Sequence, residues 1–197
     1  MSRPLALEIA SAAAHLVVEE GMEYGPAKRR AAQALGVSVR AASLPDNNLV
    51  EDEVRAHLAL FHADTQPAEL AALRTVALDW MERLAAFRPH LTGAVWRGTA
   101  TRLNNVHLQL YCDDSKQAEL GLIDLGVDYD VGSTKGPRGE PVDVLSVSSH
   151  SAALGEPVTV HLSVLDHDDL RGALKPDAAK RTLRGDLAGL RRLMEQA

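Results

Sequence analysis

The sequence LTGAVWRGTATRLNNVHLQL, residues 91–110, is the most informative part of this chain. Residues 90–95 form a short, mainly apolar run, which is typical of a strand. Residues 106–111 alternate apolar and polar side chains with a period of two, the pattern of a half-buried strand. A connection that contains glycine and threonine joins the two runs. The stretch follows Pro89 directly, so we expect the β-containing part of the protein to begin there.

The sequence before Pro89 predicts helices, because apolar residues recur there at helical spacing. Pro26 and Pro67 suit the first turns of helices, Gly36 suits a helix end, and Thr65 suits an N-cap. The expected helices cover residues 5–20, 27–35, 49–61 and 66–87, with a loop over 42–48.

The sequence after residue 110 contains both kinds of pattern. Helices are expected at 115–125 and 177–195, strands at 127–131, 142–148 and 158–165, and a glycine- and proline-containing loop at 132–141. We therefore predict an α+β protein. A helical domain at residues 1–88 is followed, at 89–197, by a mixed β-sheet with flanking helices.

The composition is that of a globular protein and excludes several classes. Of the 197 residues, 46% are hydrophobic and 24% are charged, and aromatic residues make up only 4%. The single cysteine, Cys112, excludes an intrachain disulfide and a cysteine-based zinc cluster. The sequence has no run of about 18 apolar residues, so we expect no membrane span and a cytoplasmic protein. The net charge of −6 disfavours broad binding to nucleic acid but permits a local basic patch.

Residues 91–110 resemble the signature of the DNA polymerase beta-type nucleotidyltransferases. In that signature an apolar strand ends in Gly-Ser or Gly-Gly, and a second strand then reads Asp-apolar-Asp-apolar. Gly93 matches the glycine, and Arg97-Gly98-Thr99 resembles the connection. The spacing from Gly93-Ala94 to Asn105-Val106-His107 fits the family's range. The resemblance covers roughly the second half of the chain and implies a nucleotidyltransferase-like fold.

The physical logic of that signature is the binding of a metal and a triphosphate. Carboxylates at i and i+2 on a strand point to one face, where their oxygens hold Mg²⁺. The glycine lets the backbone approach the triphosphate closely. A third carboxylate on a neighbouring strand completes the metal site and supports in-line attack on phosphorus.

The ligand positions of this chain differ from the family's. Ala94 replaces the usual serine, Asn105 replaces the first aspartate, and His107 replaces the second. An amide carries no charge, and a neutral imidazole prefers Zn²⁺ or a similar borderline metal to Mg²⁺. The usual Mg²⁺-dependent mechanism is therefore not expected.

The third position has two candidates. In the strand 158–165 the apolar residues alternate with Thr159, His161 and Ser163, which places His161 at the third position. Asp143, on the preceding strand, is the competing candidate and would be an ordinary carboxylate. The candidate metal ligands are thus His107, His161 and Asp143.

Three interpretations of these departures remain open. The chain can be a non-catalytic relative that keeps the cleft for binding. His107 and His161 can form a new polar pair that binds a divalent metal or acts as general acid and base. Alternatively, carboxylates such as Asp143 or Asp166 can restore activity from other positions. The resemblance implies nucleotidyl transfer if the chain is catalytic.

Other motifs are better explained by structure than by chemistry. Residues 28–30, Lys-Arg-Arg, with 36–38 resemble the turn of a helix-turn-helix, but the following segment is short for a recognition helix. The acidic run 166–169 is interpreted as a strand end and a helix N-cap. His57 and His62 are five apart on one helix and are not expected to face the same way, so they are not interpreted as a metal pair.

The functional expectation is a nucleotidyltransferase-like protein that binds a nucleotide or another phosphate-bearing small molecule. Gly93, Ala94, Arg97 and Arg102 are the expected phosphate-contacting residues, and Asn105, His107 and His161 occupy the metal or acid–base positions. The alternative is a non-catalytic regulatory protein that binds DNA or a protein partner through its N-terminal helices.

Overall fold

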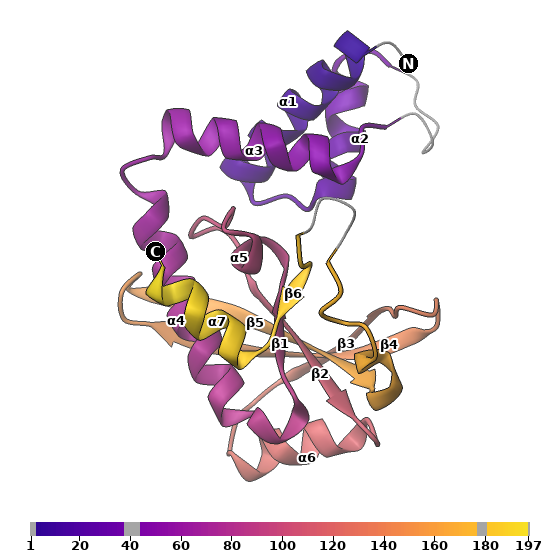
Figure 1. Ribbon diagram of the computed structural model, residues 1–197, viewed down its shortest axis with the longest axis vertical. Coiled ribbons are helices and arrows are strands. Elements are labelled where there is room, and N and C mark those ends of the chain that lie inside the picture. The colour runs from indigo at the N-terminus through magenta and orange to yellow at the C-terminus, as the bar shows by residue number, and fades with distance from the viewer. Residues whose placement is uncertain (1–2, 38–43, 177–180, 197) are drawn as a thin grey trace. The chain divides into compact units, whose positions relative to one another are not determined.

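The computed structural model describes residues 3–37, 44–176 and 181–196 and has the expected α+β class. Helices occupy the N-terminal half, and a six-stranded mixed sheet with flanking helices follows (Figure 1). The chain forms two compact units. The first contains the described residues up to Ala68 together with 99–104, and the second contains Glu69–Gly98 and the described residues from Asn105 onward.

The division between the units falls within a helix, whereas the sequence suggested a domain boundary after residue 88. Helix α4 (Gln66–Arg83) crosses the division. Most of α4 packs with the second unit, where Arg74 Nε donates to the carbonyl of Val95 at 3.3 Å. A long amphipathic helix shows in its sequence which residues are apolar, but not which unit covers them.

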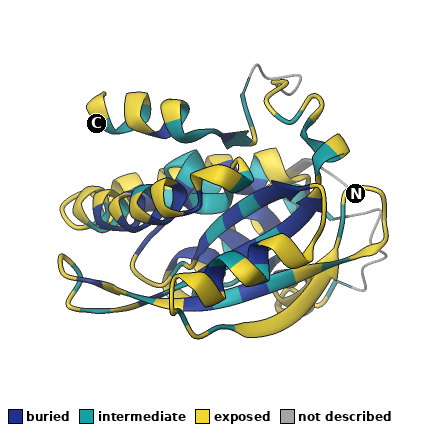
Figure 2. Cartoon of the chain, turned by 90° about the horizontal axis from the view of Figure 1, so that it is seen from below, coloured by how far each residue is buried: buried dark blue, intermediate teal, exposed yellow. Residues whose placement is uncertain are grey.

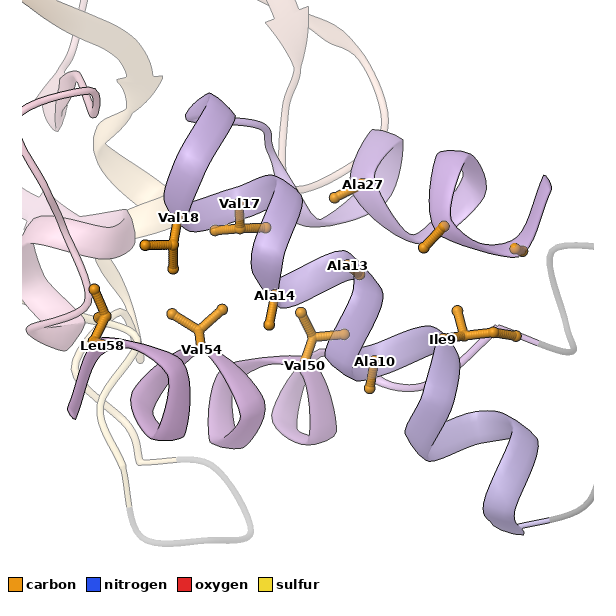
Figure 3. Packing of buried hydrophobic residues seen from close by; sticks show 12 residues of the cluster. Ile9, Ala10, Ala13, Ala14, Val17, Val18, Ala27, Val50, Val54 and Leu58 are labelled. Atoms are coloured by element: carbon orange, nitrogen blue, oxygen red, sulfur yellow. The ribbon is translucent and has the colours of Figure 1, made fainter. Parts of the chain in front are cut away.

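The first unit is built from helices α1 (Arg3–Glu20), α2 (Tyr24–Ala34) and α3 (Asn47–Phe61). Its core consists mainly of alanine and valine, so the helices can approach closely. Figure 3 shows the side chains of α1 lying between those of α2 and α3. The buried residues are Ile9, Ala10, Ala13, Ala14, Val17, Val18, Ala27, Ala31, Ala32, Val50, Val54 and Leu58.

Helix α3 begins two residues before the expected start. Asp46 is its N-cap, and its carboxylate accepts a hydrogen bond from the backbone N–H of Leu49 at 2.8 Å. This is the usual way in which an aspartate satisfies an unpaired N–H in the first turn of a helix. Part of the loop expected at 42–48 lies outside the described residues.

The second unit contains a sheet with the strand order β3-β4-β5-β2-β1-β6. Its central strands β2 and β5 are parallel, and the other neighbouring pairs are antiparallel. The strands are β1 (His90–Thr92), β2 (Val106–Cys112), β3 (Asp130–Lys135), β4 (Pro141–Ser151), β5 (Glu156–Asp166) and β6 (Arg184–Gly185). Helix α6 (Lys116–Asp124) lies between β2 and β3 in the chain, close to the expected position.

Strand β1 is shorter than the sequence suggested, because helix α5 (Gly93–Arg97) begins where residues 93–95 were expected to be extended. Gly93 has a φ of +73°, which turns the chain out of the strand. Gly98, with a φ of +80°, ends α5 in the left-handed region. The signature stretch is therefore a strand, a glycine turn and a short helix.

Two further expectations were wrong. The segment 132–135, expected as a loop, belongs to β3 and pairs with β4 although it is exposed throughout. Edge pairing uses backbone groups, so it needs no apolar side chains. Near the C-terminus the expected helix 177–195 is only α7 (Leu187–Glu195), because Asp186 caps it and β6 precedes it. Residues 177–180 lie outside the described part.

The two faces of the sheet differ in character. Apolar residues of the central strands are fully buried on one face, including Leu108, Leu110, Leu145, Val160 and Leu162. On the other face His107, Gln109, His161 and Ser163 are polar and half-buried, whereas Tyr111 and Leu165 are buried. Figure 2 shows this mixture of dark blue and teal along the central strands. Of the described helices, none combines the length and apolar character required to cross a membrane.

Candidate functional site on the polar face of the sheet

A row of polar residues crosses the sheet in register. Each strand contributes one residue, and each residue is the direct cross-strand partner of the next. Partners in register point to the same face, and neighbouring strands are about 4.8 Å apart. We call this set the polar row; its members, from β6 to β3, are Arg184, Thr92, His107, His161, Ser146 and Asp130.

The centre of the polar row is the pair of histidines that the sequence singled out. His107 on β2 and His161 on β5 are partners in the parallel pair of strands. Their ring centroids are 5.0 Å apart and their planes are inclined by 32°. The structure thus places His161 beside His107, as expected if β5 supplies the third position of the nucleotidyltransferase layout.

Both ring nitrogens of His161 have protein partners. The amide nitrogen of Asn105 lies 3.2 Å from Nε2, and the hydroxyl oxygen of Ser146 lies 2.9 Å from Nδ1. Asn105 and Ser146 therefore hold the ring in one orientation.

Gly93 lies against the same pair. A Cβ atom at this position would lie 3.7 Å from Cδ2 of His107, so the glycine keeps a small open space beside the imidazole. Ala94 and Arg97 follow in α5, where both are half-buried. Arg102 belongs to the segment 99–104 of the first unit, whereas the histidine pair belongs to the second unit.

The carboxylates that were considered as replacements are elsewhere. Ser146 is the partner of His161, and Asp143 is three residues before Ser146 on β4, so its side chain points to the opposite face. Asp166 is the N-cap of the 3-10 helix η3 (His167–Leu170) and accepts from the backbone N–H of Asp168 at 2.7 Å. This capping role is the one expected for the acidic run. Neither residue joins the histidine pair.

The residues on the polar face do not suit Mg²⁺. The positions that the resemblance aligns with two aspartates hold an amide and an imidazole, whereas Mg²⁺ requires oxygen ligands in octahedral geometry. Among the residues that the structure describes, no group of three or more close metal-ligating side chains includes His107 or His161. The pair is therefore suited to hydrogen bonding and proton transfer near neutral pH rather than to the family's metal chemistry.

Arg184 is a site residue that the sequence analysis missed. Its Nη1 donates to Oε1 of Gln109 at 2.8 Å and to the hydroxyl oxygen of Tyr111 at 3.1 Å. Both partners are neutral, so the positive charge of the guanidinium remains available for an anion. The residue was assigned to a terminal helix, and only its pairing with Thr92 across β6 and β1 reveals its position.

A cavity of about 940 Å³ lies at the His90 end of β1. His90 precedes Thr92 by two residues and shares its face of the sheet. Arg88 and Lys175 bring positive charge to the cavity wall, which Asp186 also lines, and Arg191 at the wall is paired with Glu82. Burial lowers the pKa of His90 below its usual range, although the ring is hydrogen-bonded to the carbonyl of Arg88 at 2.9 Å. The cavity could hold a small organic ligand beside the polar row.

Lys28 and Arg30, two basic residues of α2, form contacts within the first unit. Lys28 Nζ donates to the carbonyl of Pro45 at 3.0 Å and to the side chain of Asn47 at 2.8 Å. Arg30 forms an ion pair with Glu20. The ion pair with Glu20 lowers the positive charge that α2 offers to DNA, and the two hydrogen bonds of Lys28 fix its side chain at the start of α3. The segment 38–43, where a recognition helix would begin, lies outside the described residues.

The first unit holds a second cluster of potential ligands. Nε2 of His57 and Nε2 of His62 lie 2.9 Å and 2.8 Å from the same oxygen of Glu19. These hydrogen bonds lower the pKa of the Glu19 carboxyl. The expectation that His57 and His62 face apart was wrong, because His62 is the C-cap of α3 and its φ of −128° and ψ of 17° leave the helical path.

Comparison with known proteins gives no relative: no family model, no curated protein and no solved structure matches the chain. The resemblance to the nucleotidyltransferases therefore rests on the residues themselves.

Proposed function

We propose that this protein is nucleotidyltransferase-like and binds a nucleotide, or another small molecule that bears phosphate, on the polar face of its sheet. The observation that carries the proposal is the polar row, in which Arg184, Thr92, His107 and His161 lie in register on four neighbouring strands. Such a row offers a guanidinium, a hydroxyl and two imidazoles along one line.

The chemistry of these groups suits phosphate. A guanidinium forms charge-assisted hydrogen bonds with phosphate oxygens, and imidazole N–H groups donate to them as well. Gly93 leaves open space beside His107, where a backbone or side chain would otherwise block a ligand. The cavity at His90 can hold the remaining, less polar part of a nucleotide.

In this proposal the site uses other side chains in place of the family's metal ligands and does not depend on a metal ion. Arg184 takes over the charge compensation that Mg²⁺ supplies in the family. His107 is the candidate for proton transfer, and His161, whose two ring nitrogens contact Asn105 and Ser146, holds a fixed position beside it. Nucleotide binding should therefore persist when divalent metals are removed.

The test is a calorimetric titration of the purified chain with ATP, GTP, CTP and UTP, once with Mg²⁺ and once with EDTA. The same titrations are made with the His107→Ala/His161→Ala variant. The matched control is His150→Ala, which removes an exposed histidine of β4 outside the row. We expect the wild-type chain and the control to bind at least one nucleotide in both buffers, and the double variant to lose at least about tenfold in affinity.

Two results would contradict the proposal. A folded wild-type chain that binds no nucleotide in either buffer would rule out the ligand class. Equal affinity of the double variant and the wild-type chain would place the binding elsewhere. Circular dichroism spectra of all three proteins establish that any loss is not a loss of fold.

A further inference from the structure

The cluster at Glu19 brings together side chains from two helices of the first unit. Histidine and glutamate are residue types that bind transition metals in proteins. His15 and Glu19 belong to α1, His57 belongs to α3, and His62 caps α3. All four are within the first compact unit. They are far from the residues of the polar row in the sequence and have no part in the function proposed above.

The positions of these residues follow from helix geometry. His15 and Glu19 are four residues apart on α1, so their side chains lie on the same face, one turn apart. α3 packs beside α1 through Val50, Val54 and Leu58. This packing presents His57 to the His15–Glu19 face, and the rings of His15 and His57 meet edge to face with centroids 5.6 Å apart.

Three ligand atoms of the cluster already lie close together. One atom each from His15, Glu19 and His57 lies within 4.8 Å of the other two. In a tetrahedral zinc site with bonds of about 2.1 Å, ligand atoms are about 3.4 Å apart. The difference requires only small rotations, and all three side chains are at least partly exposed and free to make them.

The donor set is that of zinc. Two imidazoles and a carboxylate are ligands that borderline divalent metals prefer, whereas Mg²⁺ and Ca²⁺ prefer oxygen alone. His62 contacts the same carboxylate that His57 contacts. A hydrogen bond of this kind from outside the ligand set orients a ligating carboxylate.

We infer that His15, Glu19 and His57 form a site for a divalent transition metal, Zn²⁺ in the first instance, and that His62 positions Glu19 as a hydrogen-bond donor. Three protein ligands leave at least one coordination position for water or a small anion. A cavity of about 510 Å³ is lined by His15 and His57, so there is room for a water molecule or a small anion at the open position.

The experiment is a calorimetric titration of the full chain, prepared without a polyhistidine tag, with ZnCl₂ in a buffer that does not chelate zinc. Co²⁺ titration followed by visible absorption provides a second reading, because the intensity of the d–d bands reports coordination geometry. We expect one Zn²⁺ per chain, a four- or five-coordinate Co²⁺ spectrum, and a rise in melting temperature, since the metal joins α1 to α3.

Variants assign the ligands. His15→Ala, Glu19→Gln and His57→Ala should each weaken Zn²⁺ binding by at least about a hundredfold and abolish the melting-temperature shift. His62→Ala should weaken binding by about 10- to 100-fold, as expected for a positioning residue. Two controls should bind Zn²⁺ as the wild-type chain does: His167→Ala, an exposed histidine of the second unit, and His107→Ala/His161→Ala.

The inference is overturned if the folded wild-type chain binds no Zn²⁺ at micromolar concentrations. It is also overturned if the His15→Ala/His57→Ala variant keeps the wild-type affinity, because the metal would then be bound by other groups. If only the His107→Ala/His161→Ala variant lost Zn²⁺ binding, the metal would be bound at the polar row and not at the Glu19 cluster. Glu19→Gln preserves shape and hydrogen bonding, so a loss there cannot be attributed to misfolding.

Discussion

His107 and His161 lie side by side on the two central strands, with ring centroids 5.0 Å apart and planes inclined by 32°. They differ in their surroundings: both nitrogens of His161 are held by Asn105 and Ser146, while His107 borders the open space at Gly93. The two histidines therefore have different roles in the proposed function.

Arg184→Gln should weaken binding of a phosphate-bearing ligand by about 10- to 100-fold, because a hydrogen bond to a charged group contributes about 1.5–3 kcal/mol. The glutamine keeps a donor for Gln109 and Tyr111 and so preserves the local packing. Calorimetry with the nucleotide bound most tightly by the wild-type chain measures the change. Arg192→Gln, an exposed residue of α7, is the control. If the affinity of Arg184→Gln were unchanged, the guanidinium of Arg184 would not be part of the ligand-binding site.

Gly185→Ala should destabilise the second unit by about 1–3 kcal/mol, the usual cost of overpacking. A Cβ at Gly185 would overlap the indole ring of Trp96, whose Nε1 donates to the carbonyl of Thr182 at 2.8 Å. The overlap is removed only if the indole ring or β6 moves. Such a movement should change the fluorescence of Trp96. Gly132→Ala is the control, because its nearest neighbour would be Val144 O at 3.9 Å. Urea unfolding that is identical for both variants would refute the packing argument.

His90 should make the stability of the protein depend on pH. Burial lowers the pKa of His90 in the folded state below the usual value near 6.5. As the pH falls through 6.5, the unfolded chain takes up a proton that the folded chain resists, so the free energy of unfolding falls until the folded-state pKa is passed. His90→Asn keeps a donor for the carbonyl of Arg88 but does not titrate.

Urea unfolding between pH 7.5 and 5.5 measures this effect. The free energy of unfolding of His90→Asn should fall less over this range than that of the wild-type chain. His150→Asn, at an exposed position of β4, should retain the wild-type profile. If the free energy of unfolding changed with pH in the same way for all three proteins, His90 would not contribute to the pH dependence of stability.

The sequence predicted the features that depend on local periodicity. The α+β class, the helices of the first unit and the central strands follow from apolar spacing. His107 and His161 were singled out because the nucleotidyltransferase resemblance places them at metal-ligand positions. That these two histidines are direct partners depends on the register of a parallel pair of strands more than 40 residues apart, which periodicity does not encode.

The features that the sequence did not predict depend on contacts between distant segments. Arg184 joins the polar row only because β6 pairs with β1, and a two-residue strand has no periodicity of its own. The cluster at Glu19 depends on the packing of α1 against α3 and on the irregular backbone of His62. The spacing of His15 and Glu19 on one helix was the available signal, because residues four apart share a face.

The Asn105→Asp/His107→Asp variant should gain Mg²⁺ binding, because it places two carboxylates at i and i+2, one directly before β2 and one on its polar face. In the wild-type chain these positions hold an amide and an imidazole that do not suit Mg²⁺. Calorimetric titration with MgCl₂, alone and with a nucleotide, should show millimolar or tighter binding in the variant and none in the wild-type chain. The control is Asn104→Asp/Asn105→Asp, whose two carboxylates both lie before β2, so that neither replaces His107 on the polar face. If the first variant folds and binds no Mg²⁺, then Asn105 and His107 do not correspond to the family's metal positions, and the polar row must be explained without the nucleotidyltransferase resemblance.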